Sequence, residues 1–281
     1  MNEHESIHYL AISDILAPVG DGLIPHVCGR VDRIIFDDGK AYGVAVDGLD
    51  FTAEVVFIKA GTSDTPLLLM RYEISGPAVV THLTYHPVMI AQVVLDESLR
   101  QPTGVAVPPP RLQIPPAPDS PWNVMALRDT SPDPPHPDVA NVEENALVEL
   151  QVFCPIEYRP MNGMQGTEEG IEFDVQLSET ERVVMLALEK DADTIVKSLG
   201  RYRRGVERTS MDSGFAHLLG ACRIGKDASN SVVDSHCRPQ GTTSLYLNTF
   251  GVTPTPMAVN PTLTGTALTA LLVDHFLKRN L

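Results

Sequence analysis

The chain alternates apolar and polar residues in a way that predicts strands near its start. Residues 31–36 and 41–46 are β-branched runs that a D-D-G turn separates. An Asp-Gly step between two such runs is a strong hairpin signal, because these residues tolerate the positive φ of a tight turn. We therefore expect a β-hairpin here.

A buried strand and a helix are predicted next. Residues 54–58 form a short apolar run that ends in the turn Ala60-Gly61, which is typical of a buried strand. The apolar residues 67–70 favour a helix. Thr65 would cap it and Pro66 would occupy its first position.

Further along the chain, residues 147–153 and 171–177 alternate and predict strands with one solvated face, expected in one antiparallel sheet. The stretch S-E-T-E at 178–181 leads into apolar positions at helical spacing. Gly200 would end that helix.

The last elements are predicted to be a strand at 245–247 and a terminal helix. Asn260 is a favoured N-cap and Pro261 a favoured first helical residue. The inner face of the helix would carry Leu263, Ala267, Leu268, Leu271, Leu272 and Phe276.

Proline is dense between residues 101 and 137, so this segment is not expected to form long helices or central strands. A disordered linker is one interpretation. The other is that part of the segment packs on the protein, because Trp122 offers an apolar anchor.

Charge and cysteine content narrow the function classes. The net charge of −15 over 281 residues disfavours nucleic acid and anionic membranes as partners. No secretion signal or apolar membrane segment is visible, and the four cysteines are scattered, so a cytoplasmic protein with reduced thiols is expected. A zinc site at His217, Cys222, His236 and Cys237 is disfavoured because the spacing is too loose.

His217 and Asn260 are the candidate catalytic residues. A neutral imidazole can take a hydroxyl proton during alcohol oxidation, and the amide of Asn260 could hold the same oxygen. The helix that starts after Asn260 would offer N–H groups to a group that becomes anionic. Two simpler interpretations stay open: that His217 is a packed core residue, and that the helix is merely well capped.

Five ordered motifs of this chain resemble the glucose-methanol-choline (GMC) family of flavin oxidoreductases, and within it the pyranose 2-oxidase branch. They are H-L-L-G-A-C-R-I-G at 217–225, S-V-V-D at 231–234, G-T-T-S-L-Y-L at 241–247, P-T at 254–255 and N-P-T-L-T at 260–264. Residues 57–70 and 82–89 are similar to the strand and turn beside the flavin and the segment that follows. Residues 121–129 and 162–167 are similar to the substrate domain.

The resemblance implies a mixed α+β and α/β fold, a partial GMC fold that binds FAD. Residues 1–75 and 212–281 would be a remnant of the FAD-binding domain, and residues 76–211 an antiparallel-sheet substrate domain with the Pro-rich loop. His217 and Asn260 would be the active-site pair. The cofactor would lie against Ala60, Gly61, Asn248, Thr249, Pro261 and Thr262.

This sequence departs from the family because it contains no G-x-G-x-x-G that could open a dinucleotide-binding βαβ unit. Three hypotheses follow. The chain is a subunit that oxidises a CH–OH group of a sugar or glycoside while a second polypeptide supplies the nucleotide-binding half. Alternatively, it is a lyase or isomerase that reuses the pocket, or a non-catalytic scaffold that binds a full-length relative. A partner is expected, because a parallel sheet without its βαβ unit would expose an edge and an apolar face.

Overall fold

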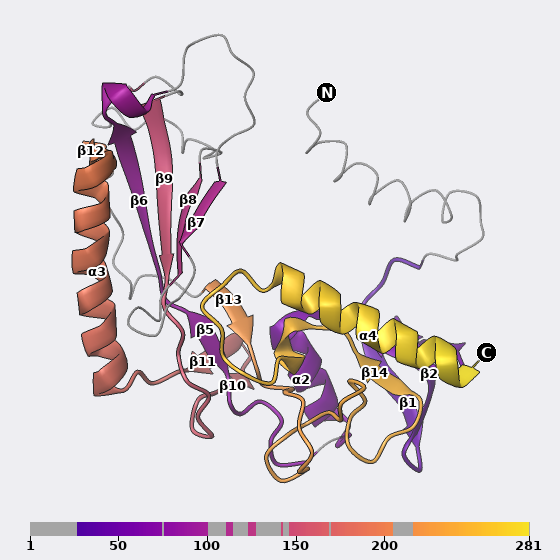
Figure 1. Cartoon of the computed structure of the whole chain (residues 1–281). Coiled ribbons are helices and arrows are strands. Elements are labelled where there is room, and N and C mark those ends of the chain that lie inside the picture. Colours follow the sequence, from indigo (N-terminus) through magenta and orange to yellow (C-terminus); the bar gives the residue numbers. More distant parts are fainter. Residues whose placement is uncertain are drawn as a thin grey trace, which may run out of the picture.

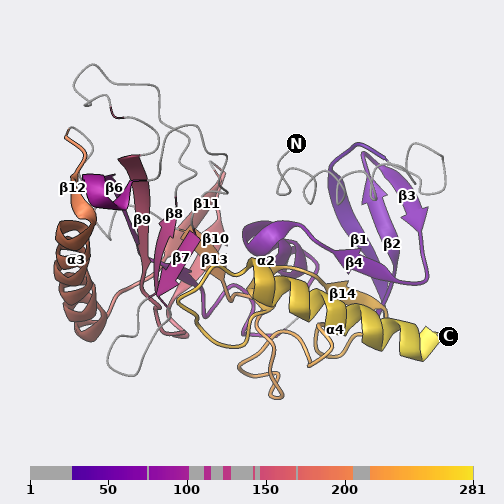
Figure 2. The same cartoon turned by 45° about the horizontal axis from the view of Figure 1, so that its top comes forward.

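The computed structural model describes residues 27–74, 76–100, 111–114, 123–127, 142, 146–168, 170–204 and 216–280. In both views, a sheet flanked by a long helix forms one end of the molecule, and a second long helix lies over the strands at the other end (Figures 1 and 2). No helix in the described ranges combines the length and the hydropathy of a membrane span.

The first strands form the predicted hairpin and extend it by one strand. β1 (Val31–Asp37), β2 (Lys40–Val46) and β3 (Leu49–Thr52) form an antiparallel sheet in that order. Asp38 and Gly39 adopt φ values of 44° and 73°, as a tight turn between twisted strands requires. The hairpin prediction is confirmed.

The predicted strand is confirmed as β4 (Val56–Ile58), which pairs in parallel with β14 (Leu245–Leu247). It is buried on one face only, because Phe57 is exposed between the buried Val56 and Ile58. The prediction for the helix that follows was wrong at its start. α2 (Gly61–Arg71) begins directly after β4, with Thr65 and Pro66 inside it. The apolar run marks only the second half of α2, because its first turn is small and polar.

A five-stranded antiparallel sheet lies at the other end, in the order β12-β6-β9-β8-β7. Its strands are β6 (Val88–Leu95), β7 (Arg111–Ile114), β8 (Asn123–Leu127), β9 (Leu147–Phe153) and β12 (Gly200–Tyr202). The Pro-rich segment therefore does supply an interior strand, contrary to expectation, because β8 is a proline-free stretch between β9 and β7. Part of the segment packs on the protein, as the second interpretation held; Trp122 lies outside the described residues.

The strand predicted at 171–177 is shorter than expected and does not join β9. β11 (Ile171–Asp174) pairs with β10 (Gly163–Gly166) in a separate two-stranded sheet. Alternation fixed the strand and its solvated face, but it carries no information about which strand is the neighbour. The expectation of a single sheet was therefore wrong.

α3 (Glu179–Leu199) packs against the five-stranded sheet through Met185, Leu188, Ala192 and Val196. Ser178 and Glu181 form a reciprocal capping box at its start, and Gly200 follows its last residue. Both ends agree with the sequence prediction, because both signals are local.

α4 (Thr262–Asn280) is the terminal helix, and it begins one residue later than predicted. The carbonyl of Pro261 accepts the first intrahelical bond, from Gly265 N–H. The predicted inner face was partly wrong. Leu272 is buried and Leu268 and Phe276 pack beside it, whereas Leu263 and Leu271 are 82% and 66% exposed and Ala267 is exposed.

The buried apolar residues form two large clusters. One joins β1, β2, β4 and α2 to β14 and α4, so it unites chain segments from both ends of the sequence. The other lies between the five-stranded sheet and α3. The described cysteines are all free thiols, and Cys154, Cys222 and Cys237 are buried.

Candidate functional site

His217 lies on a short strand whose pairing is irregular. β13 (Ala216–Leu219) pairs with β5 (Thr84–His86), with Ala216 opposite His86 and Leu219 opposite Thr84. Two residues of β13 therefore face one residue of β5, which is the count of a β-bulge. His217 sits in this bulge with a φ of 55°, a backbone conformation that is uncommon outside glycine and clusters at functional sites.

The bulge directs the imidazole of His217 toward that of His86. The two Nδ1 atoms are 3.2 Å apart, and the rings meet at an interplanar angle of 73°. Phe153, at the end of β9, lies beside both rings, with centroid distances of 5.9 Å to His86 and 5.6 Å to His217. The histidine pair therefore packs against the ring of Phe153.

Burial keeps both histidines neutral near pH 7. His86 is 1% exposed. Its desolvation and the nearby His217 lower its pKa to about 4, while the backbone of Met257 acts in the opposite direction. Desolvation also lowers the pKa of His217. A neutral His217 has a lone pair with which it could accept a proton.

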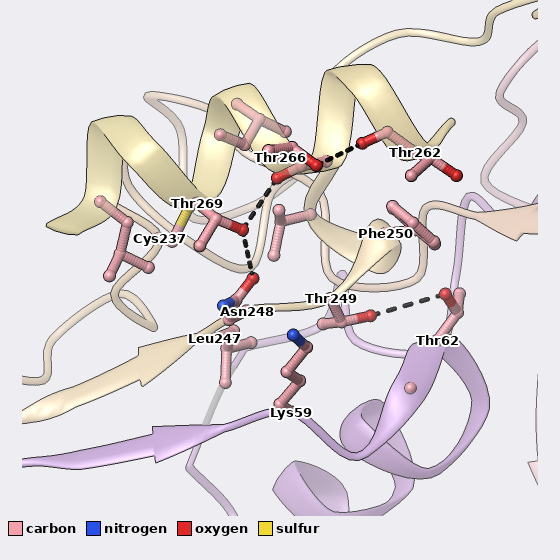
Figure 3. A pocket seen from close by; sticks show the side chains of 15 residues that line it. Lys59, Thr62, Cys237, Leu247, Asn248, Thr249, Phe250, Thr262, Thr266 and Thr269 are labelled. Atoms are coloured by element: carbon pink, nitrogen blue, oxygen red, sulfur yellow. Dashed lines mark hydrogen bonds between the residues drawn. The ribbon is translucent and has the colours of Figure 1, made fainter. Parts of the chain in front are cut away.

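A cavity of about 360 Å³ opens between α2, the end of β14 and the first turns of α4 (Figure 3). Four of the six predicted cofactor-binding residues line it: Gly61, Asn248, Thr249 and Thr262. Further lining residues are Lys59, Thr62, Cys237, Leu247, Phe250, Val252, Gly265, Thr266, Leu268, Thr269 and Leu272.

The electrostatics of this cavity favour an anionic ligand. Lys59 carries the only charged side chain among the described lining residues, and Figure 3 shows it extending toward Thr249. Gly61 is the first residue of α2, and Ala60 before it provides no side-chain cap. The N–H groups of this helix start and the partial positive charge there suit a phosphate or another anion. At Gly61 a Cβ would meet only open space.

Hydroxyl and amide groups cover the rest of the polar wall. Thr269 donates to the Asn248 side-chain oxygen at 2.8 Å, and Thr249 and Thr62 lie 3.5 Å apart (Figure 3). Thr62 also donates to the carbonyl of Leu218 at 3.0 Å. Since Leu218 follows His217, this bond joins the wall of the cavity to the strand that carries the histidine.

The loop between β14 and α4 makes a second connection between the cavity and the histidine pair. Tyr158 Oη lies 2.8 Å from Thr253 Oγ1 and donates to its carbonyl at 3.1 Å, which fixes the start of the loop. The backbone of Met257 acts on His86, and Asn260 follows three residues later. In both views, the start of α4 lies beside β13 (Figures 1 and 2).

The predicted site residues are thus distributed over two adjoining features. His217 belongs to the histidine pair, and four cofactor residues line the cavity. Ala60 adjoins the cavity as the residue before α2, Pro261 is buried before α4, and Asn260 is exposed in the loop. His86 and Lys59 were not predicted as site residues from the sequence. The sequence shows His86-Pro87 at the end of a strand and the turn Lys59-Ala60-Gly61. Neither pattern indicates a chemical role unless the residues that lie near it in space are known.

Comparisons with known proteins point to one family. Residues 165–269 match the family model described as GMC oxidoreductase. Over 58 residues the chain is 40% identical to paromamine 6'-oxidase of Streptomyces fradiae, which is 21% of this chain and 11% of that protein. Over 76 residues it is 37% identical to an uncharacterised GMC-type oxidoreductase of Mycobacterium tuberculosis, 25% of this chain and 12% of the other.

Solved structures share the fold at low sequence identity. Pyridoxine 4-oxidase from Mesorbium loti superposes with a TM-score of 0.59 and 14% identity, covering 88% of this chain and 57% of that one. Formate oxidase of Aspergillus oryzae gives a TM-score of 0.63 at 14% identity, covering 88% and 59%. The chain therefore spans less than two thirds of the length of each of these proteins.

The fold is that of the GMC oxidoreductases. With its family match at residues 165–269, this chain corresponds to a C-terminal part of that family, as its motifs indicated. The assignment to the pyranose 2-oxidase branch and the division into two domains stay predictions.

Proposed function

We propose that this chain forms the substrate-facing part of an FAD-dependent oxidoreductase that acts on a CH–OH group of a sugar or glycoside. The observation that carries the proposal is the position of the histidine pair beside a cavity suited to an anion. The family match supports the oxidoreductase class, and the similarity to a paromamine 6'-oxidase supports a sugar-related substrate.

The cavity fits one side of a flavin dinucleotide. Its volume of about 360 Å³ lies at the lower end of the range of about 300–1,000 Å³ for small-molecule sites. Lys59 and the uncapped start of α2 would bind the negatively charged part of FAD. Thr262, with Pro261 before it, would lie at the flavin ring, where the start of α4 favours negative charge. When bound, FAD would supply the hydride acceptor.

His217 and Asn260 would prepare the substrate hydroxyl. Neutral His217 takes the proton from the hydroxyl oxygen, and the Asn260 amide holds the same oxygen in place. The hydrogen bond from Thr62 to the carbonyl of Leu218 holds the strand of His217 against the cavity wall. Phe153 excludes water from one side of the pair.

The half that binds the dinucleotide would come from polypeptide outside these 281 residues, that is, from a second chain in a heteromer with this one. Three exposed features support this partner. β4 and β14 form a parallel sheet of only two strands in the described part of the chain, although parallel sheets normally have both faces covered. Phe57 of β4 is 45% exposed, and Leu263 and Leu271 of α4 are more exposed still. A nucleotide-binding half docked here would cover them.

Co-expression with the product of a neighbouring open reading frame, followed by the absorbance spectrum of the purified complex, tests the proposal. A yellow complex with flavin absorbance is expected. A colourless complex, or no complex, would contradict the flavin function of this chain. A turnover that persists without flavin but is lost in His217→Ala would instead favour the lyase or isomerase alternative.

A further inference from the structure

The contact between His86 and His217 constrains where each ring carries its proton. Two nitrogens form a hydrogen bond only if one is an N–H and the other a lone pair. Both atoms in this contact are Nδ1, 3.2 Å apart. Nδ1 of His217 is therefore occupied by His86, and only Nε2 of His217 is available to a substrate.

Two proton arrangements satisfy this contact. If His86 donates, His217 carries its proton on Nε2 and cannot accept another there. If His217 donates from Nδ1, its Nε2 has a lone pair and His86 carries its own proton on Nε2. The second arrangement alone makes His217 a base toward a hydroxyl.

The surroundings of His86 bear on this choice. Its Nε2 is buried and has no hydrogen-bond partner in the described part of the chain, so its contact with His217 is the one through which its ring interacts with the site. Since Nδ1 of His86 faces Nδ1 of His217, the proposed role of His217 as a base selects the arrangement in which Nδ1 of His86 accepts and Nε2 of His217 keeps its lone pair.

We propose that His86 is a positioning residue that holds His217 in the Nδ1–H tautomer and so keeps its Nε2 free to accept the substrate proton. This inference rests on the proposed function of His217 as a base. When Nε2 accepts a proton, the imidazolium keeps its Nδ1–H bond to His86. Because His86 is neutral, it orients His217 without the strong attraction of a carboxylate, so His217 stays unprotonated at rest.

The tautomer can be read directly by two-bond ¹H–¹⁵N NMR on the full chain with ¹⁵N-labelled histidine, with His217→Ala to assign the signal. The wild type is expected to show His217 with its proton on Nδ1. In His86→Leu the acceptor for the Nδ1–H group of His217 is lost, so the Nε2–H form of His217 should become populated. In His86→Asn the amide oxygen stands near the former Nδ1 and can accept the same bond, so the Nδ1–H form should persist.

A wild-type His217 with its proton on Nε2, or an unchanged tautomer in His86→Leu, would overturn the inference. Circular dichroism of each variant shows whether it is folded, and the tautomer of the wild type still tests the inference if the leucine variant is not folded. In the flavin complex, His86→Leu should lower kcat more than it raises KM, with rescue in His86→Asn. If the tautomers behave as expected but His217→Ala leaves turnover intact, the proposed function fails while the assignment of the pair stands.

Discussion

The ring of Phe250 lies directly against Gly265. A Cβ built on Gly265 would stand 2.1 Å from Cε1 of Phe250, so the first turn of α4 approaches this wall of the cavity only because residue 265 has no side chain. Phe250 is 36% exposed, so the ring could yield by swinging outward. This pair therefore controls the shape of the cavity where α4 begins.

Gly265→Ala is expected to displace the Phe250 ring and to lower the free energy of unfolding. In a Phe250→Ala background the same change should instead raise it by up to about 1 kcal/mol, because alanine favours a helix over glycine by about that amount. Urea unfolding of the four proteins measures both effects. The same sign in both backgrounds would show that the ring contact is unimportant.

Tyr158→Phe is expected to destabilise the loop that leads to α4. The variant removes both hydrogen bonds to Thr253, a residue that is 0% exposed, and such a loss costs about 1–2 kcal/mol. Tyr42→Phe is the matched control, because Tyr42 is 41% exposed. Thermal unfolding should separate the two, and equal melting temperatures would contradict the role of Tyr158.

His86 should make the fold sensitive to mild acid. Its pKa is about 4 in the folded protein and 6.5 ordinarily, so between these values the unfolded chain binds more protons. Stability should therefore fall as the pH decreases from 6.5 to about 4, by up to about 3.5 kcal/mol at about 1.4 kcal/mol per pH unit. In His86→Leu this part of the pH dependence should disappear. An identical profile in wild type and variant would refute the assignment.

Lys59→Met should weaken flavin binding to the assembled complex by about fivefold, because an exposed ion pair contributes at most about 1 kcal/mol. The dependence of binding on salt should decrease with it. Lys226→Met, an equally conservative change at an exposed lysine outside the cavity lining, should leave both unchanged. Fluorescence titration with FAD provides the dissociation constants, and equal values for the two variants would speak against Lys59.

The exposed side of α4 should be the docking surface for the nucleotide-binding half. Leu271→Glu is expected to leave the isolated chain folded and to abolish the complex. Leu186→Glu on α3 is a close control, because Leu186 is 68% exposed and Leu271 is 66% exposed. Size-exclusion chromatography of the co-expressed proteins tests this, and a complex that survives Leu271→Glu would place the interface elsewhere.

Local signals predicted the fold well where the information lies within a few residues. The D-G turn after β1 and the start of α3 after Ser178 depend on neighbours in sequence, so both were predicted. The start of α2 and the exposure of Leu263 were missed. The start of α2 depends on where β4 ends. The exposure of Leu263 depends on which side of α4 packs against the rest of the protein.

The candidate site was predicted in part for the same reason. His217 and Gly61 follow from motif resemblance, and the fold places Gly61 in the cavity wall. His86 could not be found in this way, because its contact with His217 spans 131 residues of sequence and depends on the bulge in β13. Such a pairing is a property of the sheet and not of any segment.

The anaerobic reduction of flavin in the assembled complex is the decisive measurement of whether His217 acts as the base. On mixing with a sugar or glycoside substrate, the flavin absorbance of the wild-type complex should bleach. The His217→Ala complex should contain the same amount of flavin but bleach at least about 100-fold more slowly, because general-base catalysis contributes about that factor or more. Equal rates of bleaching in the two complexes would contradict the account.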